Sequence, residues 1–87
     1  MTDISNKKAL IVGASGGIGS AVASMLAENG VHCALVGRNK QKLKSVFSVC
    51  SSHGNPCFSF SCDISDGSEI KRCCEEAINS LGGVNYL

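Results

Sequence analysis

The chain has 87 residues, of which 44% are hydrophobic and 17% are charged, and its formal net charge is +1. This length suits one small domain with a buried core. The near-neutral charge excludes the broad basic surface that nucleic acid or anionic lipid requires, so neither partner is expected. Residues 1–8 contain no apolar signal core, and no apolar run is long enough to cross a bilayer. We therefore expect a cytoplasmic protein, with the mitochondrial matrix as the alternative.

The six cysteines indicate a reduced protein rather than a disulfide scaffold. They form no Cys-x-x-Cys pair and lie in strand-like runs or on apolar helix faces, as Cys33 and Cys50 do. Adjacent Cys73 and Cys74 have a spacing unsuited to joint zinc ligation. The two histidines, His32 and His53, have no acidic or cysteine partner at ligand spacing. No metal site is predicted, and the thiols are expected to pack in the core.

The first strand-helix unit begins with a continuous apolar run at residues 9–12, which is typical of a strand buried on both faces. Gly30 supplies a left-handed stop for the helix that follows. The apolar positions of that helix have offsets of 0, 3, 4, 7 and 8, which predicts a buried face. That face consists of Ile18, Ala21, Val22, Met25 and Leu26.

A second buried strand is predicted at residues 31–36, and Asn39 is the expected N-cap of the next helix. The apolar face of this helix consists of Leu43, Val46, Phe47 and Cys50. A loop over residues 51–56 then leads to a third strand. Its apolar and polar residues alternate from Phe58 to Ile64, so one face is apolar and the other more polar, as in an outer strand.

The third helix has the clearest signals. Ser65 or Asp66 is its expected cap, Asp66 and Glu69 have capping-box spacing, and Gly82 is the expected stop. The apolar face consists of Ile70, Cys73, Cys74, Ala77, Ile78 and Leu81. Residues 84–87 look like the start of a fourth strand. This alternation predicts an α/β fold with a doubly wound parallel sheet of the Rossmann type, and residues 1–87 are expected to be its incomplete N-terminal part.

A glycine-rich turn, residues 13–19, separates the first strand from the first helix. This is where a dinucleotide's pyrophosphate needs free backbone amides and a positive helix end. Gly13 permits the tight exit from the strand, Gly17 lets the backbone approach phosphate, and Gly19 lets the helix pack closely on the sheet. Two other glycine loops fit less well. A P-loop requires a lysine that Ile18-Gly19-Ser20 lacks, and a methyltransferase loop, kept as a minor alternative, has closer glycine spacing.

Gly-x-x-x-Gly-Ile-Gly after the first strand, with Asp63-Ile64 closing the third, resembles the short-chain dehydrogenase/reductase family over essentially the whole chain. Val12 departs from the threonine that many members have before the first glycine. The resemblance implies that the glycine turn binds pyrophosphate and that Asp63 and Ile64 contact adenine. An alternative for Asp63 is a carboxylate that only caps the next helix. The predicted contacts of the turn are Gly13, Ser15, Gly16, Gly17, Ile18 and Gly19.

The end of the second strand predicts NADP(H) as the cofactor. An NAD-preferring site has an acid there, to accept hydrogen bonds from the ribose hydroxyls, and Gly37 occupies that position. Arg38 follows, and its guanidinium can form a bidentate pair with a 2′-phosphate. Asn39 is predicted to contribute beside it, and Lys40 to add attraction. Lys42 and Lys44 are interpreted as the solvated side of a helix.

The resemblance, most similar to the 3-oxoacyl-acyl-carrier-protein reductase or carbonyl reductase type, implies a parent enzyme that transfers hydride from NADPH to a carbonyl of a small molecule, such as a 3-oxoacyl group, ketone or quinone. Members also carry a catalytic serine and a Tyr-x-x-x-Lys pair that this sequence lacks, since Tyr86 is followed only by Leu87. No catalytic residue is therefore predicted here. A homo-oligomer is expected for the complete protein. The alternative is a truncated dinucleotide-binding or interaction module without catalysis.

Overall fold

A computed structural model describes residues 5–63 and 65–85 of the chain. Three strands and three helices alternate along it, in an order that matches the predicted units. The strands are β1 (Lys8–Val12), β2 (His32–Gly37) and β3 (Cys57–Ser61), and the helices are α1 (Gly17–Glu28), α2 (Lys40–Ser51) and α3 (Gly67–Leu81).

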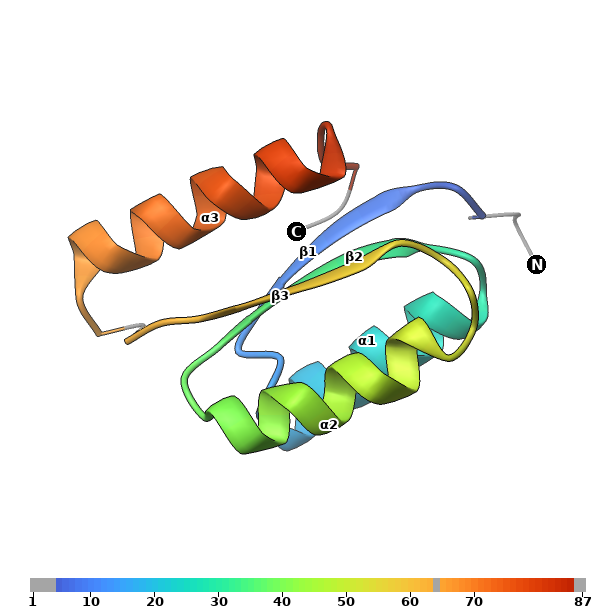
Figure 1. The fold of residues 1–87 in the computed structure, drawn as a ribbon, viewed down its shortest axis with the longest axis horizontal. Helices are drawn as coiled ribbons and strands as arrows, with labels where there is room; N and C mark the ends of the chain where they lie inside the picture. The colour runs from blue at the N-terminus through green and yellow to red at the C-terminus, as the bar shows by residue number, and fades with distance from the viewer. Residues whose placement is uncertain (1–4, 64, 86–87) are drawn as a thin grey trace.

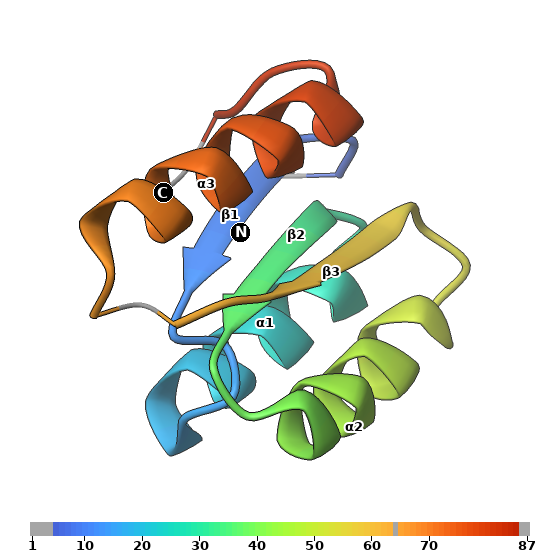
Figure 2. The ribbon, with the colours of Figure 1, turned by 60° about the vertical axis from the view of Figure 1, so that its left-hand side comes forward.

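The sheet is parallel throughout, with the order β1-β2-β3. Helices α1 and α2 cover one face and α3 covers the other, which gives three layers (Figures 1 and 2). Strand β2 is central and buried on both faces, whereas β3 forms an edge with a more polar pattern. The prediction of a parallel Rossmann-type sheet with an outer third strand is confirmed.

Each face of the sheet has its own hydrophobic core. The core beneath α1 and α2 contains Leu35, Leu43 and Cys50, and the core beneath α3 contains Val36 and Leu81. Alternate residues of β2 supply the two cores because successive side chains of a strand point to opposite faces. The predicted apolar faces of α2 and α3 point inward, except for Ile78 of α3, which is exposed. Within the described ranges, no helix combines the length and hydropathy needed to cross a membrane.

The cysteines pack in these cores, as predicted. Cys33 and Cys50 are buried on one face of the sheet and Cys62 and Cys73 on the other. Burial raises the pKa of the Cys33 thiol to about 11 and that of Cys57 to about 12. Thiols with raised pKa values are mostly protonated at neutral pH and therefore react slowly.

The predicted buried face of α1 is mostly wrong, since of its residues only Leu26 packs against the core beneath α1 and α2. The helix places Ala23 and Ala27 against the sheet, whereas Ile18 is 84% exposed and Met25 is 54% exposed. Gly19, Ala23 and Ala27 are four residues apart and lie on one face. A Cβ atom at Gly19 would collide with the Gly13 carbonyl, so the helix axis lies too close to the sheet for larger side chains. Small residues therefore form the buried face.

The fourth-strand prediction falls partly on residues outside the described ranges. Val84 and Asn85 are described and are not in a strand. Asn85 nevertheless pairs with the outer side of β1: its backbone amide donates to the Lys8 carbonyl at 2.8 Å, and its side-chain oxygen accepts from the Lys8 amide at 2.9 Å. Val84 packs against the core beneath α3. The chain after α3 thus returns to the free side of β1.

Candidate functional site

The predicted site residues that the structure describes lie at one edge of the sheet, where the parallel strands end (Figure 2). The backbone amides of Gly13 and Ala14 both donate to the Val36 carbonyl, at 2.8 and 3.1 Å. The amide of Cys62 donates to the Gly37 carbonyl at 3.0 Å. These bonds connect the exits of all three strands. In open α/β sheets this edge is the usual ligand-binding position.

The glycine turn is a compact loop whose conformation depends on two of its glycines. Gly13 has a φ of 81°, a left-handed conformation that side chains disfavour, and its carbonyl accepts from the Gly16 amide at 3.0 Å. Gly19, in the first turn of α1, lies directly against this same carbonyl, where no Cβ fits. The turn therefore brings the start of the helix directly over the end of β1.

Helix α1 has no side chain capping its N-terminus. Its N-cap is Gly16, whereas Asn39 caps α2 and Asp66 caps α3 with side-chain oxygens. Among the described residues, none accepts a hydrogen bond from the amides of Gly17, Ile18 or Gly19. Three free N–H groups at the positive end of a helix suit an anion.

The space beside Gly17 is open. A Cβ built on Gly17 meets nothing within 4 Å, and the neighbouring Ile18 is 84% exposed. A phosphate can thus approach the backbone where a side chain at Gly17 would stand in its way. The turn fits the pyrophosphate of a dinucleotide in both hydrogen-bonding capacity and room.

The end of β2 lies beside the glycine turn. A Cβ at Gly37 would be 2.9 Å from Ser15 Oγ and 3.2 Å from Leu43 Cδ1, so the second strand ends against Ser15. Arg38 and Asn39 follow on the exposed side of this junction. Asn39 Oδ1 accepts from the Lys42 amide at 3.0 Å, so this oxygen serves as the predicted N-cap of α2. The contact between Ser15 and Gly37 has no signal in the sequence, because it depends on two loops 22 positions apart.

Asp63 lies at the end of β3 with its carboxylate exposed. Its Oδ1 accepts from the Ser65 hydroxyl at 2.6 Å and the Ser65 amide at 3.0 Å. These hydrogen bonds, with a smaller contribution from the Arg38 charge, hold the pKa of the Asp63 carboxyl below its usual value. Because Asp66 is the N-cap of α3, Asp63 is not needed for that role. Ile64 lies outside the described residues.

In contrast to α1, the N-terminus of α3 is capped by a side chain. Asp66 accepts from the amides of Ser68 and Glu69, while Glu69 Oε1 accepts from the Asp63 amide at 3.1 Å. The predicted capping box is thus half formed, since Glu69 reaches back to Asp63 rather than to Asp66. This bond anchors the residue predicted to contact adenine.

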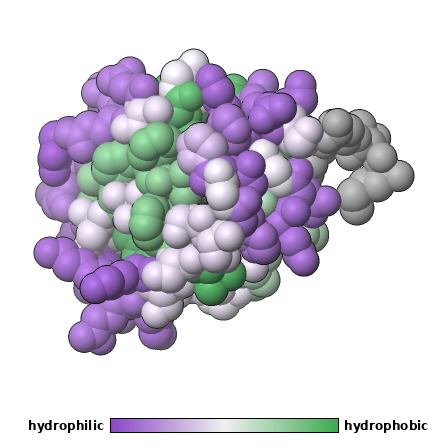
Figure 3. All heavy atoms as spheres, turned by 45° about the vertical axis from the view of Figure 1, so that its right-hand side comes forward, coloured by the Kyte–Doolittle hydropathy of each residue, from purple (hydrophilic) through white to green (hydrophobic). Residues whose placement is uncertain are grey.

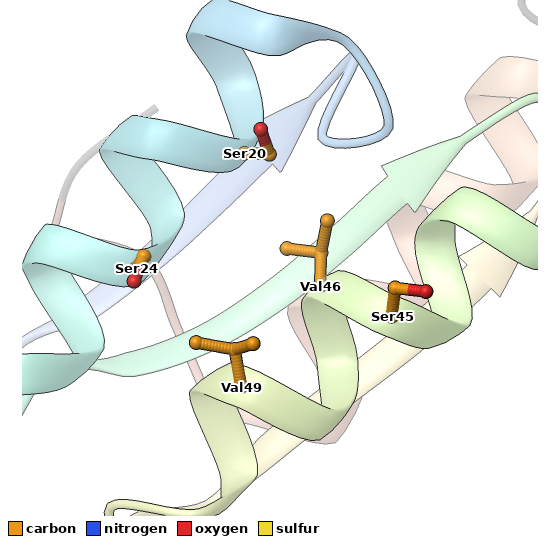
Figure 4. Close-up of a pocket in the computed structure, with 5 residues that line it drawn as sticks. All are labelled: Ser20, Ser24, Ser45, Val46 and Val49. Atoms are coloured by element: carbon orange, nitrogen blue, oxygen red, sulfur yellow. The ribbon is translucent and has the colours of Figure 1, made fainter.

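A groove of about 210 Å³ lies between α1 and α2 (Figure 4). Ser20 and Ser24 line it from α1, and Ser45, Val46 and Val49 line it from α2. The hydroxyls of Ser20 and Ser45 donate to carbonyls of their own helices. It is a packing gap between two helices. In the portion that the structure describes, no three His, Cys, Asp or Glu residues are arranged to hold a metal ion.

A parallel sheet with a glycine turn leading into an uncapped helix is the architecture of the dinucleotide-binding α/β proteins. A family model described as short chain dehydrogenase matches residues 7–87, so the chain belongs to this oxidoreductase family, whose members use nicotinamide dinucleotides.

Individual relatives agree with this membership. Fatty acyl-CoA reductase of Acinetobacter baylyi is 33% identical over 98% of this chain, and 3-oxoacyl-[acyl-carrier-protein] reductase of Staphylococcus epidermidis is 34% identical over 94%. The chain spans only 29% and 34% of these relatives. The structure of an NAD⁺-bound xylitol dehydrogenase superposes with a TM-score of 0.90 at 26% identity, over 97% of this chain and 32% of that one.

Proposed function

We propose that this chain is the NADP(H)-binding part of a short-chain oxidoreductase that reduces a carbonyl. The observation that carries the proposal is the uncapped start of α1, where the amides of Gly17, Ile18 and Gly19 donate no hydrogen bond among the described residues and the space beside Gly17 is open. Gly17, Ile18 and Gly19 would bind the pyrophosphate through these amides. Bound at this edge, NADPH would supply the hydride.

The end of β2 supports NADP(H) over NAD(H). Gly37 offers no carboxylate to the ribose, and Arg38 follows it on the exposed side. Asp63 is near enough to Arg38 for the guanidinium to lower the pKa of its carboxyl. Arg38 and Asp63 would therefore flank the adenosine, with Arg38 on the 2′-phosphate, Asp63 toward the adenine, and Asn39 and Ile64 beside them.

The chemistry after cofactor binding requires groups that these 87 residues do not include. The only tyrosine, Tyr86, is not followed by the lysine of a Tyr-x-x-x-Lys pair. We therefore propose that this chain binds and orients NADP(H) without turning over a substrate. The names of the relatives favour a small carbonyl compound such as a 3-oxoacyl thioester, and a soluble homo-oligomer in the cytoplasm is the proposed setting.

The test is to titrate NADPH and NADH into the wild type and Arg38→Ala. A charge-assisted contact contributes about 1.5–3 kcal/mol, so NADPH should bind roughly 10- to 150-fold more weakly to the variant. NADH affinity should hardly change. Lys42→Ala is the matched control, because it removes the same charge from an exposed position on α2. Equal losses for both cofactors, or an equal loss in Lys42→Ala, would contradict the NADP(H) assignment.

A further inference from the structure

The free edge of β3 and the first half of α2 together form a groove of about 290 Å³. Two lysines and two serines line it above an apolar floor. The lining residues are Lys40, Leu43, Lys44, Phe47, Ser59 and Ser61. Neither the glycine turn nor Arg38 contributes to it.

The backbone of β3 is unsatisfied along this groove. The Pro56 carbonyl accepts from the Cys33 amide and the Cys62 amide donates to the Gly37 carbonyl, so even-numbered residues of this segment pair with β2. Because backbone groups alternate in direction along a strand, the N–H and C=O groups of Cys57, Ser59 and Ser61 point away from the sheet. An exposed edge of this kind can pair with a further strand.

The side chains beside this edge differ on its two faces. On the α2 face, Ser59 and Ser61 line the groove together with Lys40 and Lys44, and neither lysine forms an ion pair within the described part of the chain. No acidic residue occurs between Glu28 and Asp63. On the α3 face, Phe58 and Phe60 are half-buried at the margin of the core. In Figure 3, a hydrophobic area lies left of the centre, with hydrophilic side chains above and below it.

We propose that this groove binds an extended peptide segment of a partner protein in which acidic and apolar residues alternate. Its backbone would pair with β3 as an added strand, which is a common mode of peptide recognition. Acidic side chains would face Lys40 and Lys44, and apolar side chains would extend the surface of Phe58 and Phe60. The spacing of the charges agrees. Lys40 and Lys44 are four residues apart on a helix, a rise of about 6 Å, and acidic residues two positions apart on a strand are separated by about 6.6 Å.

The probe is a labelled, end-blocked heptapeptide of alternating valine and glutamate, added to the ¹⁵N-labelled protein. We expect the amide signals of Cys57, Ser59 and Ser61 to shift, and those of Phe58 and Phe60 to shift less. A peptide of the same composition with valines and glutamates in separate blocks should bind at least about 5-fold more weakly, because only alternation places like side chains on one face.

Two variants test separately the contribution of the lysine charge and that of backbone pairing with β3. Lys44→Glu should weaken binding about 5- to 10-fold, as expected for reversal of one exposed ion pair, and should improve binding of a valine-lysine peptide. Ser59→Pro should abolish binding, since it removes an outward N–H while leaving the β2 pairing intact. Lys71→Glu on α3 is the control for net charge and should bind like the wild type.

Several results would overturn the proposal. Equal affinity for the alternating and block peptides, or equal weakening by Lys44→Glu and Lys71→Glu, would show attraction without strand pairing. Shifts confined to the glycine turn would place the peptide in the nucleotide site. Concentration-dependent shifts at Cys57, Ser59 and Ser61 without peptide would show that a second copy occupies this edge.

Discussion

Gly17 and Gly19 lie two positions apart at the start of α1, yet their surroundings differ completely. Gly19 abuts the Gly13 carbonyl, whereas Gly17 has open space above it. Neither has a positive φ, so conformation alone would tolerate alanine at both. The structure thus assigns Gly19 a packing role, and open space at Gly17 is what a ligand requires.

Substituting these two glycines by alanine should therefore affect different properties, stability at Gly19 and dinucleotide binding at Gly17. Gly19→Ala should lower the free energy of unfolding by about 1–3 kcal/mol, because helix and turn must move apart. Gly17→Ala should leave stability unchanged or slightly raised, since alanine favours helix, but should weaken dinucleotide binding. Urea denaturation and NADPH titration of both variants measure this. Equal stability of the two variants would contradict the geometry of the turn.

At the scale of the element, the N-terminus of α3 depends on a charged cap. The Ser68 hydroxyl, followed by the amides of Glu69 and Ser68, holds the pKa of the Asp66 carboxyl below its usual value. A carboxyl with a lowered pKa in the folded state stabilises the fold above its unfolded pKa of about 3.9 and loses this effect as the pH falls through the folded value. The pKa of the Asp63 carboxyl is also lowered in the folded state, so Asp63 affects stability in the same way as the pH falls.

Asp66→Asn should make the stability of the fold less dependent on pH in the acidic range. Asparagine keeps an N-cap oxygen but does not titrate, so the variant should lose less stability than the wild type as pH falls below about 4. Asp66→Ala, which removes the cap, should be less stable than both at pH 7. Thermal melts between pH 7 and pH 3 test this. If all three proteins lost stability in parallel, the cap would not be charge-dependent.

The helices also show where sequence periodicity works and where it fails. For α2 and α3, the predicted apolar residues mark the buried face apart from the exposed Ile78, and Asn39, Asp66 and Gly82 mark their ends correctly. For α1 the periodicity selects the wrong face. Hydrophobicity scales rank Ile18 and Met25 above Ala23, but the close approach that Gly19 permits makes side-chain size the deciding property. Such a close approach is a tertiary fact that spacing within one helix does not encode.

Two substitutions on α1 test this interpretation. Ala23→Leu should destabilise the fold by about 1–3 kcal/mol, because Ala23 is completely buried and extra volume forces the helix outward. Met25→Lys should change stability by less than about 0.5 kcal/mol, since its side chain is largely exposed. Chemical denaturation of each variant gives the comparison. A larger loss of stability for Met25→Lys than for Ala23→Leu would instead support the buried face predicted from periodicity.

At the scale of the whole molecule, the fold follows from the sequence because each strand-helix unit carries local signals and parallel sheets have few allowed connections. The position of the glycine turn follows for the same reason. The contact of Ser15 with Gly37 and the bond from the Asp63 amide to Glu69 do not, because each depends on how separate segments meet. The positions of the candidate residues in the fold are therefore predictable from the sequence, but their contacts with one another are not.

The most direct test of the central claim is to follow the backbone amide signals of the ¹⁵N-labelled protein during NADPH titration. The free amides of Gly17, Ile18 and Gly19 should show the largest saturable shifts, with smaller ones at Arg38 and Asp63. The outer face of α3 should remain unchanged. Saturable binding that leaves the three amides unmoved, or no binding at millimolar NADPH, would contradict a dinucleotide site at the start of α1.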